Sequence, residues 1–375
     1  MFISKECFAD SEIRAMIEQD GETGDCDITG AKEIVGYNTE NPNRTFDLSD
    51  NLSEILYIYS PESELPKDFP VDRKDYLENI LANNWSIFSD KVAKNRITTI
   101  VKAICKDAFP LDDARYHEKV GIKELSNPDY LSKICLTKDT DWESFMNSIK
   151  SINRFHSNHL NLEVLADLFK SESLLKIISP KDKVEFFRGR ICGEQGCDTG
   201  EMGAPKKDET VAGRVNCQGI RCLYLANDLK TVVHEIKARD FEYVTIGSFS
   251  PRRKLQLINL SILGEISPFT AGLTFGFEWF AINMPILKKI CFEIAKPLRR
   301  QEGELDYLPT QYIADFIKSQ KFDGICYQST LCDGGINYAI FDPKKFACNR
   351  TELLQINSVK YNYKQLSTES QVKNS

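Results

Sequence analysis

The residue pattern changes near residue 180, and this change limits the folds open to a chain of 375 residues. Between Tyr76 and Cys105, apolar residues recur at mostly three-to-five-residue steps, and similar spacing returns in DWESFMNSIKSINRF and LEVLADLF. Such spacing predicts amphipathic helices. After residue 180, short runs of β-branched and aromatic residues alternate with Gly, Pro, Asn and Asp, which predicts strands. We therefore expect an α+β protein in which an all-α domain precedes a mixed domain.

The expected strands are VEFFRGRI, RCLYLA, YVTIGSF, KLQLINL, GICYQS and NYAIFD, with helices between them in DLKTVVHEIKAR and LPTQYIADFIKSQ. A chain of this length exceeds what one hydrophobic core usually organises. We divide it into a small N-terminal cap at 1–60, a helical domain at 70–175, a mixed domain at 180–350 and a disordered tail at 364–375. The tail has almost nothing to bury.

Composition narrows the functional classes. The chain is 42% hydrophobic and 27% charged, and it has neither a bilayer-length apolar run nor a basic, apolar leader. These features predict a cytoplasmic protein without a membrane partner. The formal net charge of -7 has the wrong sign for a protein whose main task is gripping a nucleic-acid backbone.

The twelve cysteines are scattered over a long chain, and reduced thiols are the better interpretation in a cytoplasmic protein. Two pairs have matching spacing, Cys192/Cys197 and Cys217/Cys222, but zinc ribbons usually use CxxC, which neither pair has. The sequence therefore predicts no metal.

Groups suited to an anionic, flat ligand are concentrated between Arg188 and Glu235. Arg188 ends an expected strand and Arg214 follows a glycine, and guanidinium groups bind phosphate oxygens with two parallel hydrogen bonds. The segment 193–213 contains five glycines and suits a mobile loop that closes over a small molecule. Tyr224, at the end of LYLA, offers a ring face for stacking.

An acid follows on the next expected helix, which begins at Asn227 or Asp228. Its neighbours are apolar, so the Glu235 carboxylate should emerge near the buried face and needs a partner or a function. One carboxylate is sufficient to stabilise an oxocarbenium-like transition state, as in glycosidases. Taken singly, each of these residues is more often structural: an Arg or Glu is usually solvated, and Ser329 in GICYQST could simply cap a turn.

The ordered series of motifs resembles the RES domain family, which is named for its Arg, Glu and Ser. The series runs FFRGR, then MGAPKKDETVAGRVNCQGIRCLYLANDLKTVVHEIKA, then YLPTQYIADFIKSQKFDGICYQST. The resemblance covers roughly residues 184–343, and its most specific part spans 212–235. It implies an ADP-ribosyltransferase-like split β-sheet with flanking helices. It also implies consumption of NAD by cleavage of the nicotinamide–ribose bond, typically in a bacterial toxin paired with an antitoxin.

Carried onto this chain, the resemblance assigns a role to each matching residue. Arg188 and Arg214, with Asn216 beside them, would bind the diphosphate side of NAD, and Tyr224 would pack against nicotinamide or its ribose. Glu235 would stabilise the developing cation, and Ser329 would hydrogen-bond the same end of the pocket. NAD is then a substrate, the catalytic residues are Arg188, Glu235 and Ser329, and no metal is needed. An antitoxin or regulatory protein is the expected partner, and self-association stays open.

The N-terminal part is similar to the helical HEPN-type domain that precedes RES in longer family members, sometimes behind a CxxC…CxxC zinc ribbon. Here Cys7 and Cys26 are present, but Ser4 and Thr29 stand where the other ligands are expected. Hydroxyls are poor zinc ligands, so this ribbon is degenerate and should hold no zinc.

Two other functions stay open at this point. HEPN ribonucleases use an Arg followed by a His after four to six residues, and RFHSNH supplies Arg154 and His159. His is a competent general base near neutral pH. The other alternative is a non-enzymatic interaction protein with a decayed pocket.

Overall fold

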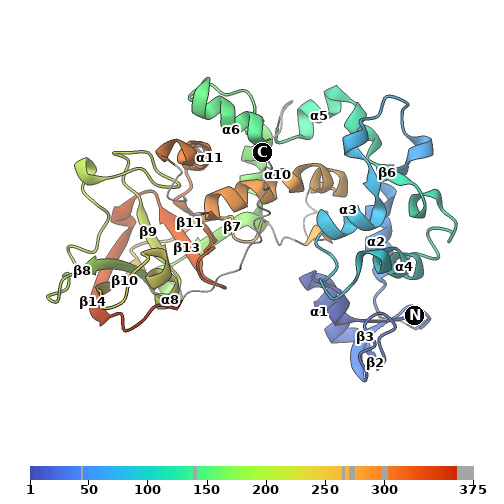
Figure 1. Cartoon of the computed structure of the whole chain (residues 1–375), viewed down its shortest axis with the longest axis horizontal. Coiled ribbons are helices and arrows are strands. Elements are labelled where there is room, and N and C mark those ends of the chain that lie inside the picture. The colour runs from blue at the N-terminus through green and yellow to red at the C-terminus, as the bar shows by residue number, and fades with distance from the viewer. Residues whose placement is uncertain (44, 138–141, 264–266, 270–274, 297–302, 361–375) are drawn as a thin grey trace, which may run out of the picture.

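The computed structural model describes residues 1–375 except 44, 138–141, 264–266, 270–274, 297–302 and 361–375. The tail predicted at 364–375 lies outside the described residues. Two parts lie along the long axis of the molecule: helices with two small sheets on the N-terminal side, and a large sheet on the C-terminal side (Figure 1). A long helix, α10, lies between them.

Helices dominate the N-terminal part, as the apolar spacing predicts. Each buries one face, as α4 does with Ile97, Ile100, Val101 and Ile104. The helices are α1 (Ser11–Asp20), α2 (Leu48–Tyr57), α3 (Leu77–Asn83), α4 (Lys94–Ile104), α5 (Pro128–Ile134), α6 (Trp142–Ser151) and α7 (Leu162–Lys170).

Two three-stranded sheets correct the expectation of an all-α N-terminal domain. Their orders are β1-β3-β2 and β4-β6-β5. The strands are β1 (Phe2–Ser4), β2 (Glu22–Gly24), β3 (Ile34–Asn38), β4 (Ser60–Pro61), β5 (Asp75–Tyr76) and β6 (Lys119–Gly121). Strands of two or three residues are too short to show a period-two pattern, so pairing with distant partners rather than local sequence creates them.

An eight-stranded sheet organises the C-terminal part and confirms the expected mixture of α and β. Its order is β14-β10-β8-β9-β13-β12-β11-β7, and only the β11–β12 pair among these neighbours is parallel. The strands are β7 (Leu175–Ile178), β8 (Phe186–Cys192), β9 (Leu223–Ala226), β10 (Tyr243–Pro251), β11 (Leu255–Asn259), β12 (Gly324–Gln328), β13 (Ile336–Ile340) and β14 (Phe346–Gln355).

The sheet is weakest in its middle, between β8 and β9. These strands share one paired position, Phe187 with Ala226, whereas β8 and β10 pair over seven positions. Beyond that position the two strands diverge, and no further ladder pairing joins them. The expectation of an ADP-ribosyltransferase-like split sheet stays a prediction.

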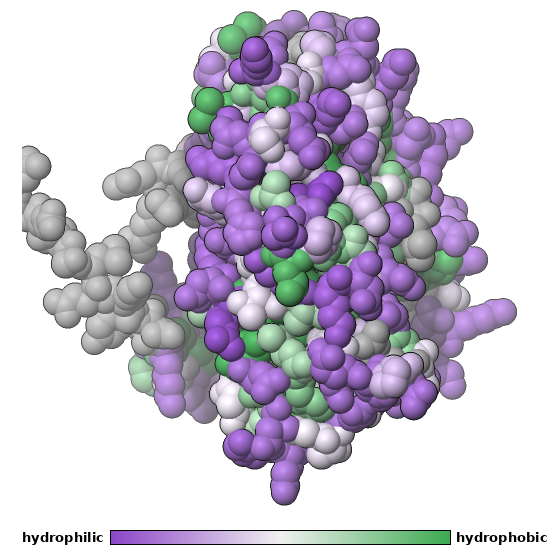
Figure 2. Space-filling view, turned by 90° about the vertical axis from the view of Figure 1, so that its right-hand side faces the viewer, coloured by the Kyte–Doolittle hydropathy of each residue, from purple (hydrophilic) through white to green (hydrophobic). Residues whose placement is uncertain are grey.

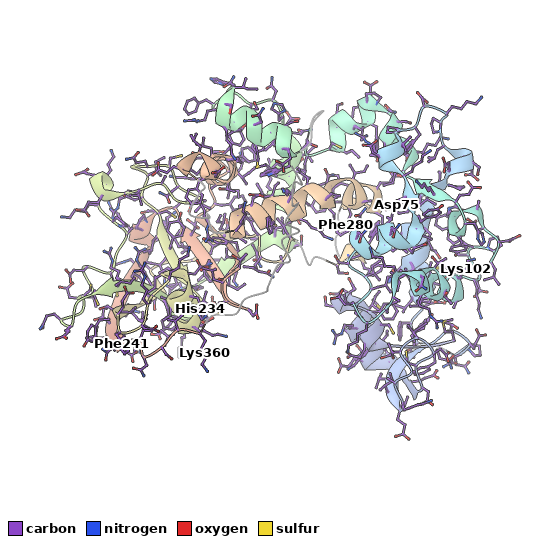
Figure 3. The ribbon with its side chains drawn as sticks, viewed as in Figure 1. Asp75, Lys102, His234, Phe241, Phe280 and Lys360 are labelled. Carbon is purple, nitrogen blue, oxygen red and sulfur yellow. The ribbon has the colours of Figure 1, made fainter. Side chains whose placement is uncertain are left out.

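Among the residues described, the helices that accompany this sheet are α8 (Leu229–Glu235), α10 (Phe277–Ala295) and α11 (Leu308–Ser319). Helix α10 carries a central Pro285 and buries residues along its whole length. Phe280 lies in the first turns of this helix, on the side of the N-terminal part (Figure 3). Its ring stacks on Trp85 with centroids 5.2 Å apart. The largest buried cluster accordingly contains residues from both parts.

Polar contacts fix α10 against the N-terminal part as well. The buried Asn283 side chain accepts from Leu136 N at 2.8 Å and donates to Ile134 O at 3.0 Å. Lys288 Nζ donates to the Asn84 carbonyl at 3.1 Å and to Ser86 Oγ at 2.9 Å. Because these bonds satisfy groups inside the shared core, α10 is held at one position relative to α3.

The N-terminal face of the molecule is mainly hydrophilic, and apolar residues appear on it as small separate patches (Figure 2). Within the described ranges, no helix combines the length and apolar character that a membrane crossing requires.

Candidate functional site

A pocket of about 300 Å³ lies where β8 and β9 diverge. It collects four of the residues singled out from the sequence: Arg188, Arg214, Tyr224 and Glu235 all line it. These side chains come from β8, a loop, β9 and α8, so the sheet brings together residues up to 47 positions apart. Ser329 and Asn216 do not line the pocket but contact residues that do.

Arg188 lies in the gap between the diverging strands. Its Nη1 lies 3.4 Å from the carbonyl oxygen of Tyr224, and its buried Nε has no hydrogen-bond partner. Burial, with a contribution from Arg190, lowers the pKa of Arg188 from its ordinary value to about 10. The guanidinium therefore stays charged at neutral pH but has no anionic partner in the part of the chain that the structure describes, and a bound phosphate would supply one.

Local sequence places Glu235 beside that gap. Asp228 caps α8 by accepting from Thr231 N at 2.7 Å, which fixes where the helix starts. Helix α8 lies directly on β8 at Gly189, where a Cβ atom would be 2.6 Å from Val232 Cγ1. Only glycine allows this approach, and it brings the last residue of α8, Glu235, to the pocket wall.

Two neutral side chains orient the Glu235 carboxylate. Ser329 Oγ donates to Glu235 Oε1 at 2.7 Å, and Asn337 Nδ2 donates to the same oxygen at 2.6 Å. The other oxygen, Oε2, lies 3.6 Å from Arg214 Nη2, and the exposed fractions of the two side chains are 20% and 12%. The carboxylate is thus held on one oxygen and faces a cation and the pocket with the other.

The loop that carries Arg214 is fixed from three sides. Arg214 Nη1 donates to the Ala295 carbonyl at the end of α10 at 3.0 Å, and Thr310 Oγ1 of α11 donates to the Arg214 carbonyl at 2.6 Å. The guanidinium also lies 6.0 Å from the Tyr327 ring centroid. Arg214 is therefore positioned before any ligand binds.

Tyr224 lines the pocket, and its hydroxyl group bonds to the turn behind the pocket. The hydroxyl donates to Asn216 Oδ1 at 2.6 Å, and burial raises the pKa of Tyr224 well above its ordinary value. The Asn216 amide donates to the carbonyls of Val211, Cys217 and Ile220. Asn216 therefore closes the 211–220 turn and holds Tyr224, so any effect on a ligand is indirect.

Residues that the sequence did not single out complete the pocket. Tyr307, Tyr327 and Asn337 line it. Tyr327 and Asn337 are register partners in the β12–β13 pair, and directly opposed residues share one face of a sheet. Pairing the expected strands GICYQS and NYAIFD as a hairpin would have placed Tyr327 and Asn337 opposite each other, and this is how the sequence could have identified them.

Gln311 of α11 was also missed. It is buried, and its Nε2 donates to the Gly213 carbonyl at 2.8 Å and to the Asn216 carbonyl at 2.9 Å. Its Oε1 accepts from Cys217 Sγ at 3.2 Å. One side chain thus ties the Arg214 loop to α11, and its position inside an amphipathic helix gave no local signal.

The glycine-rich segment 193–213 contributes only Gly213 to the pocket lining. Arg190 Nη2 donates to the Gly203 carbonyl at 2.8 Å, Arg221 donates to the Ala204 and Pro205 carbonyls, and Met202 is fully buried. These contacts anchor the middle of the segment against the sheet. They do not show the closure over a small molecule that its glycines suggested.

Cys7 and Cys26 lie together at the N-terminal end, with their sulfur atoms 3.7 Å apart. Burial acts to raise the pKa of Cys26, but hydrogen bonds from Thr29 and Ser4 outweigh it and leave the pKa lowered. Burial raises the pKa of Cys7 to about 12. Across the described residues, no three His, Cys, Asp or Glu side chains gather as metal ligands do.

Arg154 and His159 lie in the connection between α6 and α7. Arg154 is exposed and lines a second pocket, against α11, whereas His159 does not line that pocket. The two residues are therefore not assembled on one pocket wall.

Residues 190–358 match the model of the family described as RES domain. The matched range contains Arg214, Tyr224, Glu235 and Ser329, begins two residues after Arg188, and confirms the resemblance of the C-terminal part to that family. The HEPN-type resemblance of the N-terminal part stays a prediction.

No curated protein matches the chain. Among solved structures, the chain is similar to one in the crystal structure of the M. tuberculosis MbcT-MbcA toxin-antitoxin complex, with 9% identity and a TM-score of 0.27, over 48% of this chain and 86% of that chain.

Proposed function

We propose that the pocket between β8 and β9 binds NAD and cleaves its nicotinamide–ribose bond. One observation carries this proposal: two guanidiniums, an aromatic ring and an oriented carboxylate from four separate segments line a single pocket. The match of residues 190–358 to the RES domain model supports it.

Arg188 and Arg214 are the proposed anchors for the diphosphate. Both carry charge in a partly buried setting, and Arg188 has a buried donor without a partner among the described residues. A diphosphate bound there would satisfy that donor and bring the attached ribose toward Glu235, because Arg214 lies within 3.6 Å of the carboxylate. Tyr224 would offer its ring to the nicotinamide or its ribose.

Glu235 would act by electrostatics. As the bond from the ribose carbon to the nicotinamide nitrogen breaks, its electron pair leaves with nicotinamide and positive charge develops on the ribose. A carboxylate fixed beforehand by Ser329 and Asn337 stabilises that charge without reorganising. An acceptor with a lone pair, whether water, phosphate or a protein side chain, then bonds to the ribose carbon and, if it carries a proton, loses it.

In a cell this activity would deplete NAD, and we propose a cytoplasmic toxin or defence effector restrained by an antitoxin or regulatory protein. The N-terminal part is the candidate regulatory element, because it holds α10, whose last carbonyl accepts from Arg214. The proposed chemistry uses no metal, since the carboxylate alone supplies the countercharge.

Replacing Glu235 tests the proposal. In Glu235→Gln the side chain keeps its size but loses the charge, so we expect nicotinamide release to fall by about a thousandfold, the scale of one preorganised electrostatic group. Unchanged circular dichroism and an unchanged melting temperature would show an intact fold. If nicotinamide is released at the wild-type rate, the proposed role of Glu235 is wrong.

A further inference from the structure

A second pocket, of about 290 Å³, lies between the end of α6 and helix α11. Its walls are largely aromatic and aliphatic, and they include Ile149, Phe155, Leu308, Tyr312 and Phe316. We name it the α6–α11 pocket. Its volume resembles that of the NAD pocket, and its apolar walls suit the body of a small ligand.

Two opposite charges in the α6–α11 pocket have no partner. Arg154 and Asp315 both line it, and neither makes an ion pair or a hydrogen bond with any residue that the structure describes. By contrast, Lys150 of α6 does find a partner, Asp306 in the turn before α11, at 2.6 Å. Desolvation raises the pKa of Asp315 even though the nearby Lys318, which makes no ion pair with it, acts to lower that pKa.

The thiol of Cys217 also lines this pocket. Burial is the largest cause of its raised pKa, Asp315 raises it further, and Arg154 and Lys318 lower it, so both pocket charges are close enough to act on one sulfur atom. Cys217 Sγ donates to Gln311 Oε1, and Gln311 also lines the pocket. A small zwitterion could therefore meet both charges at once.

We propose that the α6–α11 pocket binds a small zwitterion with an apolar body, the chemistry of an apolar α-amino acid. Its carboxylate binds Arg154, its ammonium binds Asp315, and its side chain packs among Phe155, Tyr312 and Phe316. Neither a purely anionic nor a purely cationic ligand satisfies both charges, and each would meet one like charge in the same pocket.

Occupancy of this pocket has a route to the NAD pocket. Gln311 forms part of the α6–α11 pocket wall and also donates to the carbonyls of Gly213 and Asn216, on either side of Arg214. A ligand that packs on Gln311 would hold it in the conformation that positions Arg214. This consequence rests on the proposed NAD activity, whereas the binding itself does not.

Calorimetric titration of the full chain tests the binding without NAD. L-phenylalanine and L-leucine are the zwitterionic probes, and 2-phenylethylamine and 3-phenylpropionate each lack one of the two charges. We expect a dissociation constant of about 1 mM or lower for at least one amino acid, and binding at least about tenfold weaker for both single-charge compounds. Absence of binding by both amino acids at about 10 mM overturns the proposal.

Variants assign the binding to this pocket. Arg154→Gln and Asp315→Asn should each weaken amino-acid binding by about tenfold or more, because each removes one charge-assisted contact. Lys321→Gln, an exposed change just after α11 and outside the pocket lining, is the matched control. Bound L-phenylalanine should also slow alkylation of Cys217 by iodoacetamide, followed by peptide mass spectrometry. Wild-type affinity in both charge variants overturns the proposal, even if nicotinamide release is confirmed.

Discussion

The proposed NAD pocket, between β8 and β9, and the α6–α11 pocket have similar volumes, but their carboxylates have different surroundings. Glu235 accepts hydrogen bonds from Ser329 and Asn337 and faces Arg214, whereas Asp315 and Arg154 have no partner among the described residues. A carboxylate oriented in advance can stabilise charge that develops in a reaction. Unpaired charges at a rim can be satisfied by a ligand that brings its own. The comparison therefore separates a candidate reaction site from a candidate binding site.

After Glu235→Gln, the largest loss of NAD cleavage is expected when Arg188 is replaced, and this loss should leave amino-acid binding in the α6–α11 pocket unchanged. Arg188→Gln removes a partly desolvated phosphate contact, so we expect kcat/KM for NAD to fall by about a hundredfold or more. The melting temperature should change little, because the buried Nε has no partner among the described residues and Nη1 makes only a long contact, 3.4 Å, with the Tyr224 carbonyl. Steady-state kinetics with thermal denaturation checks both. Arg188→Lys is the matched variant, and full activity in it would contradict two-pronged phosphate binding.

The next largest effect on activity is expected when the hydrogen bonds to the Glu235 carboxylate are removed. Ser329→Ala and Asn337→Leu each remove one donor from Glu235 Oε1, and we expect each to lower kcat by about ten- to a hundredfold, with less effect on KM. The double variant should lose less than the product of the two effects, since both donors act on one oxygen. A change in KM alone would show that these residues bind substrate instead of orienting the acid.

Gln311→Leu should have a moderate effect. It frees the carbonyls of Gly213 and Asn216, loosens the Arg214 loop and leaves Glu235 with its donors. We expect KM for NAD to rise by about tenfold with little change in kcat, measured at saturating and limiting NAD. Thr310→Val, which removes the bond to the Arg214 carbonyl, is the comparison variant and should act in the same direction. A fall in kcat without a rise in KM would exclude this positioning role.

The smallest effect is expected at His234, the neighbour of Glu235. Its ring is exposed, with Nδ1 2.8 Å from the Lys230 carbonyl oxygen, and it does not line the NAD pocket (Figure 3). His234→Ala should therefore change nicotinamide release by less than about twofold. A loss of activity comparable to that of Glu235→Gln would mean that a histidine acid or base takes part.

Much of the C-terminal part followed from local sequence. Six expected strands and two expected helices are present, and Asp228 caps α8 as expected. Helix α10 was not predicted, because it is apolar on all sides and contains Pro285, which hides the helical period. Strands β7 and β14 were missed as well. β14 carries exposed polar residues at several positions and is fixed by pairing with β10.

The part of the candidate site that could be predicted consists of residues that belong to the ordered series of sequence motifs. Arg188, Arg214, Tyr224 and Glu235 were singled out, and the structure brings them to one pocket. Asn337 and Gln311 were not, because their contacts depend on the β12–β13 register and on how α11 packs, neither of which a single residue signals. The anchoring of segment 193–213 was missed for the same reason, since Arg190 and Arg221 hold its carbonyls from the sheet and a distant turn.

The central claim is that this chain breaks the nicotinamide–ribose bond of NAD, and one measurement tests it most directly. Purified full-length protein is incubated with NAD, and the products are identified by mass spectrometry, with and without inorganic phosphate or cell extract. We expect free nicotinamide together with ADP-ribose, its phosphorylated form or an ADP-ribosylated protein. Intact NAD under all of these conditions, with a folded protein and an accessible pocket, would contradict it.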